Sequence, residues 1–444
     1  MSMRRISIIT SQQYLLYLAI ISVFWGDLLF SMPISSIHLS PFRLLLLFLL
    51  LLFVGNISFI NHGVLNLSHI KVKPYLQFLA FWLAYAFLSL MWAADKDLAI
   101  KNIIFLFIGI SIVFLLVYYF REKNNFKYLY WLWLLVFITL IPLGFWELTT
   151  GNHLIMSNLL DEDQLVVKFI PTAVFHNTND FATYIALTLP MILVWIRYYP
   201  NLYSRVLGIT IFTLGLILLI VTRSRSNYIA VSTGIIFWFI VLVKFKSKMK
   251  ILAITAICFL LFVFFFADDT AMLNIKDILT IGEHRISSMS GTELQGDLSI
   301  SRRQNLIKNA LYFTIQSVGF GVGVGNIEYY MAEYPIYPVD GLVNVHNWWA
   351  EILANYGVFI FVGYLILYVS LLLNLYRVYR KVSDRTVRMI CEALLIGWVG
   401  FFMGSGASSS IISFAPQWIY LGFILAFLNY VRISETALMS KCVL

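Results

Sequence analysis

Two pairs of arginines lie where positive charge needs a chemical explanation. Arg223 and Arg225 occur in TRSRS, a short turn between two long apolar runs. Arg302 and Arg303 occur in SISRRQ, where the spacing of Ser and Gln predicts a capping box and puts both arginines in the first turn of a helix. Positive charge opposes the helix dipole there unless an anion such as phosphate binds. Both pairs are therefore candidate phosphate ligands, and contacts with lipid headgroups or solvent are the alternative.

One histidine has the chemistry of a general base. His346 and Asn347 lie in the segment NVHNWWAEILANYG, and Glu351 follows in the same expected helix. An imidazole with a pKa near neutrality can take a proton from an attacking hydroxyl, and Glu351 is a possible supporting carboxylate or substitute base. Alternatively, His346 caps the helix or joins the interfacial aromatic belt, where the two tryptophans are expected.

A second polar segment, FHNTNDFATYIA, carries His176 and Asn179 immediately before an apolar run. Its Asn, Thr and Asp residues suit the cap of a helix, and His176 is a weaker candidate for contact with a ligand. No HExxH or similar histidine spacing indicates zinc, so we expect neither a metal nor a cofactor.

The chain that must position these residues has the composition of a membrane protein. Of its 444 residues, 61% are hydrophobic and 12% are charged, and the mean hydropathy is +0.85. The net charge of +9 is explained by the sorting of basic residues across a membrane, and no nucleic-acid motif is present. The three cysteines lack CxxC spacing, which argues against a disulfide framework or a metal cluster.

Apolar stretches of roughly 17 to 25 residues predict the helices that cross the bilayer. No internal repeat is found, so residues 1–444 are expected to form a single integral membrane domain of the all-α polytopic class. About twelve spans are predicted, near 14–30, 42–60, 75–93, 99–120, 128–146, 181–197, 204–222, 226–244, 250–266, 355–373, 387–405 and 410–430.

The distribution of lysine and arginine predicts the orientation. Most of the 31 basic residues fall in the two tails and in alternate loops, which places both termini in the cytoplasm. TRSRS and the long loops 147–180 and 267–346 then share the extracytoplasmic face. The large loop 267–346 is expected to contain an amphipathic helix on the membrane surface, followed by GFGVGVGN as a flexible turn rather than a phosphate cradle.

Together these segments resemble the bacterial O-antigen ligase and polymerase superfamily, whose members are membrane glycosyltransferases. The resemblance rests on HNTND, on TRSRS, on Arg303 followed by fifteen residues and Gly319, and on the final His-Asn helix. The ligase branch has His, then Asn, Ser or Gln, nine residues, Gly, two residues, and Gly, Thr or Tyr. His346 and Gly357 fit this pattern, whereas Ile360 departs from it and favours the polymerase branch.

The resemblance implies that Arg225 and Arg303 bind the pyrophosphate of the donor, with Arg223 and Arg302 as neighbours. His346 would then activate or orient the acceptor hydroxyl. The family is metal-independent and inverting, and two guanidinium groups can neutralise a diphosphate leaving group.

The expected activity is polymerisation of a cell-surface polysaccharide of the teichuronic-acid, O-antigen or capsule type. Glycan would pass from an undecaprenyl-pyrophosphate-linked oligosaccharide to a hydroxyl of another lipid-linked repeat unit, with membrane lipid around the site. A flippase and a chain-length regulator are expected partners, whereas nucleic acid is not. The alternatives are a ligase that transfers finished glycan to a lipid, wall or protein acceptor, and, more remotely, a lipid-linked glycan transporter or a structural scaffold.

Overall fold

In the part of the chain that the structure describes, long helices form a bundle and two short strands pair in antiparallel fashion. The computed structural model describes residues 3–34, 37–60, 67–162, 164–244, 291–406 and 411–442. The first part of the chain forms α1 (Met3–Leu29), the paired strands β1 (Met32–Ile34) and β2 (Ile37–Leu39), α2 (Pro41–Gly55), α3 (Lys73–Leu88), α4 (Lys96–Tyr119), α5 (Lys123–Thr150) and α6 (Leu165–Lys168). The second part forms α7 (Thr178–Tyr198), α8 (Leu202–Val221), α9 (Arg225–Phe237), α12 (Gly291–Gln316), α13 (Ile327–Glu333), α14 (Trp348–Lys381), α15 (Arg385–Gly404) and α16 (Ala415–Cys442).

The all-α polytopic class is confirmed. Within the described ranges, nine helices are long and apolar enough to cross a membrane, and each corresponds to a predicted span. Two further predicted spans, 14–30 and 410–430, correspond to α1 and α16. The count of twelve is not confirmed, because the predicted span 250–266 lies outside the described residues.

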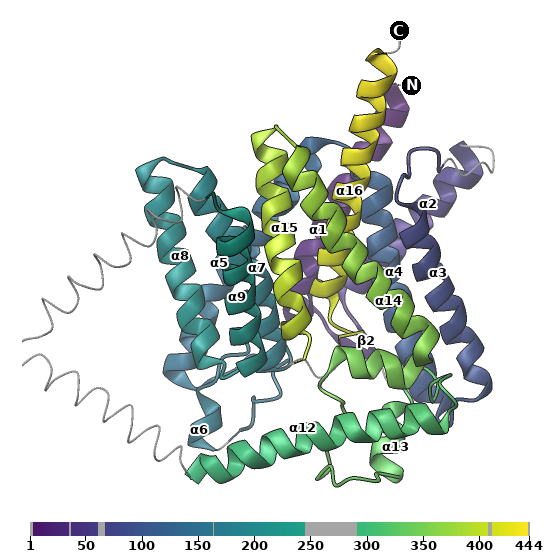
Figure 1. Ribbon diagram of the computed structural model, residues 1–444, viewed down its shortest axis with the longest axis vertical. Helices are drawn as coiled ribbons and strands as arrows, with labels where there is room; N and C mark the ends of the chain where they lie inside the picture. The colour runs from purple at the N-terminus through teal and green to yellow at the C-terminus, as the bar shows by residue number, and fades with distance from the viewer. Residues whose placement is uncertain are drawn as a thin grey trace, which may run out of the picture.

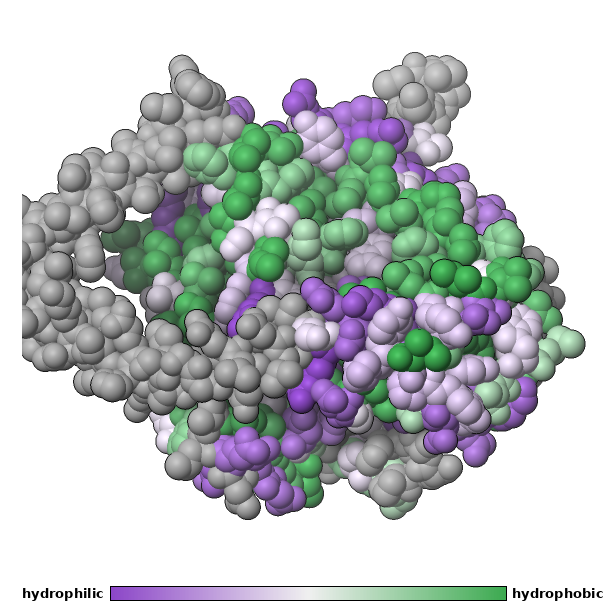
Figure 2. Space-filling view, turned by 60° about the horizontal axis from the view of Figure 1, so that its bottom comes forward, coloured by the Kyte–Doolittle hydropathy of each residue, from purple (hydrophilic) through white to green (hydrophobic). Residues whose placement is uncertain are grey.

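The two ends of the bundle differ in what they carry. Both chain termini lie at one end, whereas α12 lies across the other end beside α13 (Figure 1). At the end with the termini, an Arg432 guanidinium nitrogen donates to the Lys71 carbonyl at 3.1 Å, and Lys123 pairs with Asp384 at 2.9 Å. On the face shown in Figure 2, hydrophobic residues form a band across the bundle, and hydrophilic ones gather at the top of the view and on the end turned toward the viewer. This is the pattern expected of helices surrounded by lipid.

A buried carboxylate inside the bundle is compensated by several hydrogen-bond donors. Glu392 of α15 is fully buried and forms an ion pair with Arg197 at the end of α7. Its oxygens also accept hydrogen bonds from the Tyr198 hydroxyl at 2.8 Å and the Trp238 indole nitrogen at 2.6 Å. Because every partner is a donor, this cluster ties α7 and α15 to the π-helical turn Trp238–Leu242 that follows α9, without an uncompensated charge.

Helix α12 begins earlier than its sequence predicts. The helix starts at Gly291, so Arg302 and Arg303 lie well inside it and not in its first turn. The preceding stretch TELQGDLSI contains no proline and several good helix formers, and these extend the helix back past the expected cap. The two arginines therefore do not face free amides at a helix end. They project from the side of a helix.

The expected amphipathic character of α12 is only partly confirmed. Leu306 and Ala310 are buried and pack with residues that follow the helix, but Leu311 and Ile315 of the expected apolar face are exposed. The helix still lies across the end of the bundle (Figure 1). One side packs against the protein, and the apolar residues on another side remain available to lipid.

The glycine-rich stretch after α12 packs tightly against a break in α14, so the expected flexible turn is wrong. Gly357 interrupts α14 with φ 76° and ψ −176°, and its neighbour Val358 donates a backbone hydrogen bond to the Gly319 carbonyl at 2.8 Å. A second backbone bond of 2.8 Å joins Val322 to Ala354. A side chain at Gly357 would overlap the Gly319 carbonyl. We call this contact the glycine clasp.

The turn between α3 and α4 holds the glycine clasp from its other side. The Asn326 side chain accepts from the Asp95 amide at 2.7 Å and donates to the Asp95 carbonyl at 3.0 Å. The Ser89 hydroxyl accepts from the Val324 amide at 3.1 Å, and the Trp92 indole donates to the Gly321 carbonyl at 3.0 Å. Polar backbone that would be costly near lipid is thus paired inside the protein.

The two tryptophans after His346 do not form an interfacial belt. Trp348 is fully buried, with its ring centroid 6.0 Å from Trp82 and 5.8 Å from Tyr364. Trp349 is half-buried and packs on Phe402 at 4.9 Å. The break at Gly357 turns the first part of α14 into the protein, so its aromatic residues pack in the core.

Replacing Gly357 with alanine should destabilise the protein. The change combines a left-handed backbone position with overlap of the Gly319 carbonyl, and each effect costs about 1–3 kcal/mol. The melting temperature of detergent-purified protein should fall by several degrees or the yield should collapse. Gly55→Ala is the matched control, because nothing lies within 4 Å of that position. An unchanged melting temperature for Gly357→Ala would show that the clasp is not needed for stability.

Candidate functional site

Hydrogen bonds join the HNTND and TRSRS segments. Asn177 caps α7 by accepting from the Asp180 amide at 2.9 Å, in agreement with the expected helix cap. The next asparagine, Asn179, accepts from the Ser224 hydroxyl at 2.9 Å, and the Thr178 hydroxyl donates to the Thr222 carbonyl at 3.4 Å. Asn179 therefore positions the arginine turn directly.

Ser224 is the centre of this connection, a role that the sequence alone did not reveal. It lies between the two arginines, is 4% exposed, and accepts from the Asn227 amide group at 2.9 Å. The same Asn227 nitrogen lies 3.2 Å from the Thr183 hydroxyl. Because the serine is buried and bonded, Arg223 and Arg225 on either side of it are exposed. Arg223 also adopts a left-handed backbone with φ 56°.

The end of α15 lies between the arginine turn and the His346 segment. The Trp348 amide donates to the Ser405 carbonyl at 3.0 Å. A Cβ atom placed on Gly406 would lie 3.9 Å from the Asn347 amide nitrogen and 4.0 Å from the Ser226 hydroxyl. The structure thus brings the TRSRS and His-Asn segments to the same place, although more than a hundred residues separate them in the chain.

His346 is held in an uncommon backbone conformation. It is half-buried with φ 51°, a left-handed value that non-glycine residues seldom adopt. Asn347 follows as the cap of α14, and its side chain accepts from the Ala350 amide at 3.0 Å. Glu351 lies in the first turn and is 8% exposed. Strained residues of this kind concentrate at functional sites.

The charges of Arg303 and Arg225 lie near enough to act on each other. Burial lowers the pKa of Arg303, and the positive charge of Arg225 lowers it further. A guanidinium group nevertheless stays protonated, so two like charges from α12 and α9 are held near each other. An anion bound between them would remove this repulsion and gain charge-assisted hydrogen bonds.

Arg302 faces a different partner from its neighbour. Its Nε atom pairs with Asp340 at 2.6 Å, and both side chains are partly exposed. Asp340 belongs to the segment that leads from α13 to His346, and it also has a left-handed φ of 48°. The pair therefore links α12 to the approach of His346.

A buried contact between a glutamate and a histidine, which the sequence reasoning missed, fixes the loop before HNTND. Both side chains are fully buried where Glu147 lies 3.2 Å from His153. The carboxylate also accepts from the backbone amides of Thr172 at 2.8 Å and Ala173 at 2.6 Å, and the other imidazole nitrogen contacts the Lys168 carbonyl at 2.7 Å. A glutamate near the end of an apolar span was the only signal in the sequence.

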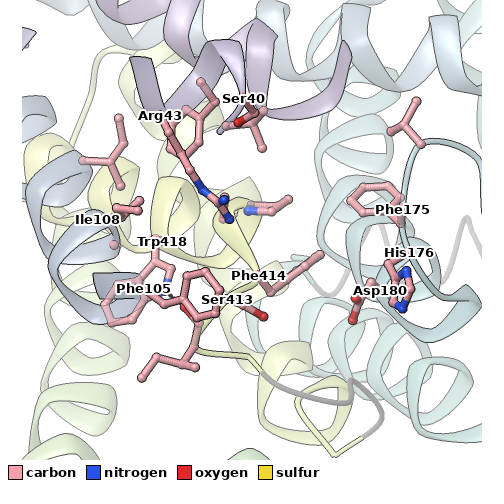
Figure 3. A pocket seen from close by; sticks show the side chains of 18 residues that line it. Ser40, Arg43, Phe105, Ile108, Phe175, His176, Asp180, Ser413, Phe414 and Trp418 are labelled. Carbon is pink, nitrogen blue, oxygen red and sulfur yellow. Dashed lines mark hydrogen bonds between the residues drawn. The ribbon is translucent and has the colours of Figure 1, made fainter. Parts of the chain in front are cut away.

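His176 faces a separate cavity rather than the arginine pair. The cavity has a volume of about 210 Å³ and lies among α2, α4, the start of α7 and the start of α16. Arg43 points into it from one side, while His176 and Asp180 line the opposite side (Figure 3). Sequence reasoning did not select Arg43, although a charged residue near the start of an apolar helix is a functional candidate.

The fold and site define a class: a multi-pass membrane protein whose polar motifs meet at one end of an apolar bundle. Residues 208–365 match the family model described as O-antigen ligase, and this range includes Arg225, Arg303, His346 and Gly357. The chain is also 32% identical, over 95% of its length and 86% of the relative's, to the teichuronic acid biosynthesis protein TuaE of Bacillus subtilis (strain 168).

The chain therefore belongs to the O-antigen ligase and polymerase superfamily. Its function lies in polysaccharide biosynthesis as a membrane glycosyltransferase of the polymerase or ligase type, and substrates of this family are lipid-linked oligosaccharides in the membrane.

Replacing the two neighbouring arginines of α12 should affect stability differently. Arg303→Gln removes a charge that burial and Arg225 make unfavourable, so it should raise the melting temperature or leave it unchanged. Arg302→Gln breaks the pair with Asp340 and should lower stability by up to about 1 kcal/mol. Both are measured by thermal unfolding in detergent without ligand. A lower melting temperature for Arg303→Gln alone would show that this arginine has a structural role.

Proposed function

We propose that the protein polymerises a cell-surface polysaccharide from undecaprenyl-pyrophosphate-linked donors. The observation that supports this most is the pair of like charges, Arg225 of α9 and Arg303 of α12, which lie near enough for the charge of one to act on the other although they are distant in the sequence. Such a pair costs free energy in the empty protein and gains it when a diphosphate binds. The relative's role in teichuronic acid biosynthesis supports a polymer of acidic sugars.

The proposed reaction is an inverting transfer without a metal. The hydroxyl oxygen at the nonreducing end of the acceptor attacks the anomeric carbon of the donor from the face opposite the diphosphate. The bond between that carbon and the diphosphate oxygen breaks, and undecaprenyl diphosphate leaves with the electron pair. His346 accepts the hydroxyl proton and later releases it to water. Arg225 and Arg303 stabilise the negative charge that develops on the leaving group.

The remaining candidate residues support these steps. Arg223 lies beside Arg225 and contacts lipid headgroups or the outer edge of the diphosphate. Arg302 pairs with Asp340 in the segment that leads to His346. It therefore lies near the bound diphosphate without contacting it. The other supporting residues are Asn179, which fixes the arginine turn, Asn347, which caps the His346 helix, Glu351, a reserve carboxylate, and His176, which faces the acceptor.

The proposed orientation places the site outside the cytoplasmic membrane and both termini in the cytoplasm. Its support is the gathering of basic residues, such as Lys71, Lys123 and Arg432, at the end that carries the termini, opposite α12. A flippase would then deliver the lipid-linked unit to this face, and a chain-length regulator would limit the polymer.

Ligation of finished glycan to another acceptor is the second candidate. The description of the matched family model as O-antigen ligase favours it. Ile360 favours polymerisation, because it is fully buried in the core where the ligase pattern has a smaller or polar residue. Purified protein given one lipid-linked repeat unit and no other acceptor should produce a ladder of longer chains. A single unreacted band, with transfer restored by a different acceptor, would establish a ligase.

Alanine variants at Arg225, Arg303 and His346 should each lower the rate of chain extension by at least about 10²-fold, because each removes a charge or proton contact in the transition state. Arg223→Ala should be milder than Arg225→Ala. Polymer length on gels and initial rates from purified protein measure the effect, and protein abundance in membranes controls for insertion. Lys308→Ala, an exposed cation of the same helix α12, is the matched control. Unchanged chain length for all three variants would contradict the proposed function.

A further inference from the structure

The cavity beside HNTND has the features of a sugar subsite separate from the arginine pair. Its volume of about 210 Å³ equals roughly seven water molecules in the liquid, enough for one sugar ring and too small for an oligosaccharide. Its lining combines aromatic surface with a few convergent polar groups, the usual composition of a small-molecule site. The polar lining residues are Ser40, Arg43, His176, Asp180 and Ser413.

One wall of the cavity is positively charged. Arg43 lies in the first turn of α2, is half-buried, and has its guanidinium carbon 5.5 Å from the centroid of the Phe105 ring. This stacking directs a buried stem and a charged head toward the cavity (Figure 3). Ser40 caps α2 by position and is 4% exposed, yet its side chain makes no capping hydrogen bond. A cation and a hydroxyl thus face the same space.

The opposite wall offers hydrogen-bond acceptors. Asp180 is held by the Asn177 side chain at 2.8 Å, and His176 is fixed through its Nδ1 atom, 3.0 Å from the Met156 carbonyl. Carboxylate and imidazole groups in this arrangement suit the hydroxyls of a sugar. A free phosphate fits poorly, because Asp180 would repel a doubly charged ligand that filled the cavity.

Aromatic side chains form the remaining surface. Trp418 packs against the backbone of α4, where a Cβ on Gly109 would overlap the Trp418 ring. Phe175 and Phe414 pack together with their centroids 6.0 Å apart. Rings fixed in this way provide flat apolar surface against which the carbon face of a sugar can lie.

We propose that this cavity binds the terminal sugar of the acceptor and selects one that carries a carboxylate, as a uronic acid does. The carboxylate pairs with the positive charge of Arg43, whose guanidinium group has five donors and can serve more than one partner. The sugar hydroxyls lie toward Asp180 and His176. Asn179, next to Asp180, binds the arginine turn through Ser224, so the cavity and the diphosphate site share one wall. This inference rests on the proposed function, because it names the sugar that the acceptor presents.

The test compares two acceptors that differ only in charge. Full-length protein in lipid nanodiscs is titrated with an undecaprenyl-diphosphate disaccharide ending in glucuronic acid and with its counterpart ending in glucose. Wild-type protein should bind the acidic acceptor at least 10-fold more tightly. Arg43→Gln should remove this preference by weakening only the acidic acceptor, and Arg43→Lys should restore part of it. Equal affinities in the wild type, or equal weakening of both acceptors by Arg43→Gln, would overturn the proposal.

A second variant separates this inference from the proposed function. Arg225→Gln should leave the ratio of the two affinities at 10-fold or more, because Arg225 contacts a diphosphate and not the terminal sugar. Transfer is then assayed separately with wild-type protein. If the binding preference holds and no transfer occurs, the proposed function fails and the charged-sugar cavity stands. If transfer occurs without a preference, the cavity proposal fails and the polymerase or ligase function stands.

Discussion

The contact between the backbones of Gly319 and Gly357 fixes the parts of the site that come from the second half of the chain. Arg303 lies on the helix that ends just before Gly319, and His346 lies just before the helix that breaks at Gly357. Only glycine allows the two backbones to approach so closely. The spacing from Arg303 to Gly319 and the spacing from His346 to Gly357 therefore both end on the same contact. The glycine clasp therefore fixes the position of α12, which carries Arg303, relative to the start of α14, which follows His346.

A second set of contacts joins the first half of the chain to the part that the glycine clasp holds. Buried Ser224 bonds to Asn179 and leaves Arg225 facing outward, and the end of α15 lies between this turn and Asn347. The resulting proximity of Arg225 and Arg303 is unfavourable in the empty protein. We propose that this repulsion preorganises the site for an anionic leaving group, which would then bind with little rearrangement of the protein.

The sequence predicted the helical class and the positions of the described spans, because lipid leaves a backbone few alternatives to the helix. It also selected the arginines and His346. It misplaced the start of α12, since a capping box is a weak signal beside strong helix formers. It missed the clasp, the Ser224 bridge and Arg43, because tight backbone contacts and a shared cavity depend on tertiary packing that spacing does not encode.

The central claim is that one diphosphate lies between Arg225 and Arg303. A double-mutant cycle for binding of undecaprenyl diphosphate, with Arg225→Gln, Arg303→Gln and the double variant, tests it most directly. A shared ligand predicts non-additive losses with a coupling energy of at least about 1 kcal/mol, because each arginine binds less once the other is gone. Strictly additive losses, or no loss in either single variant, would contradict the account.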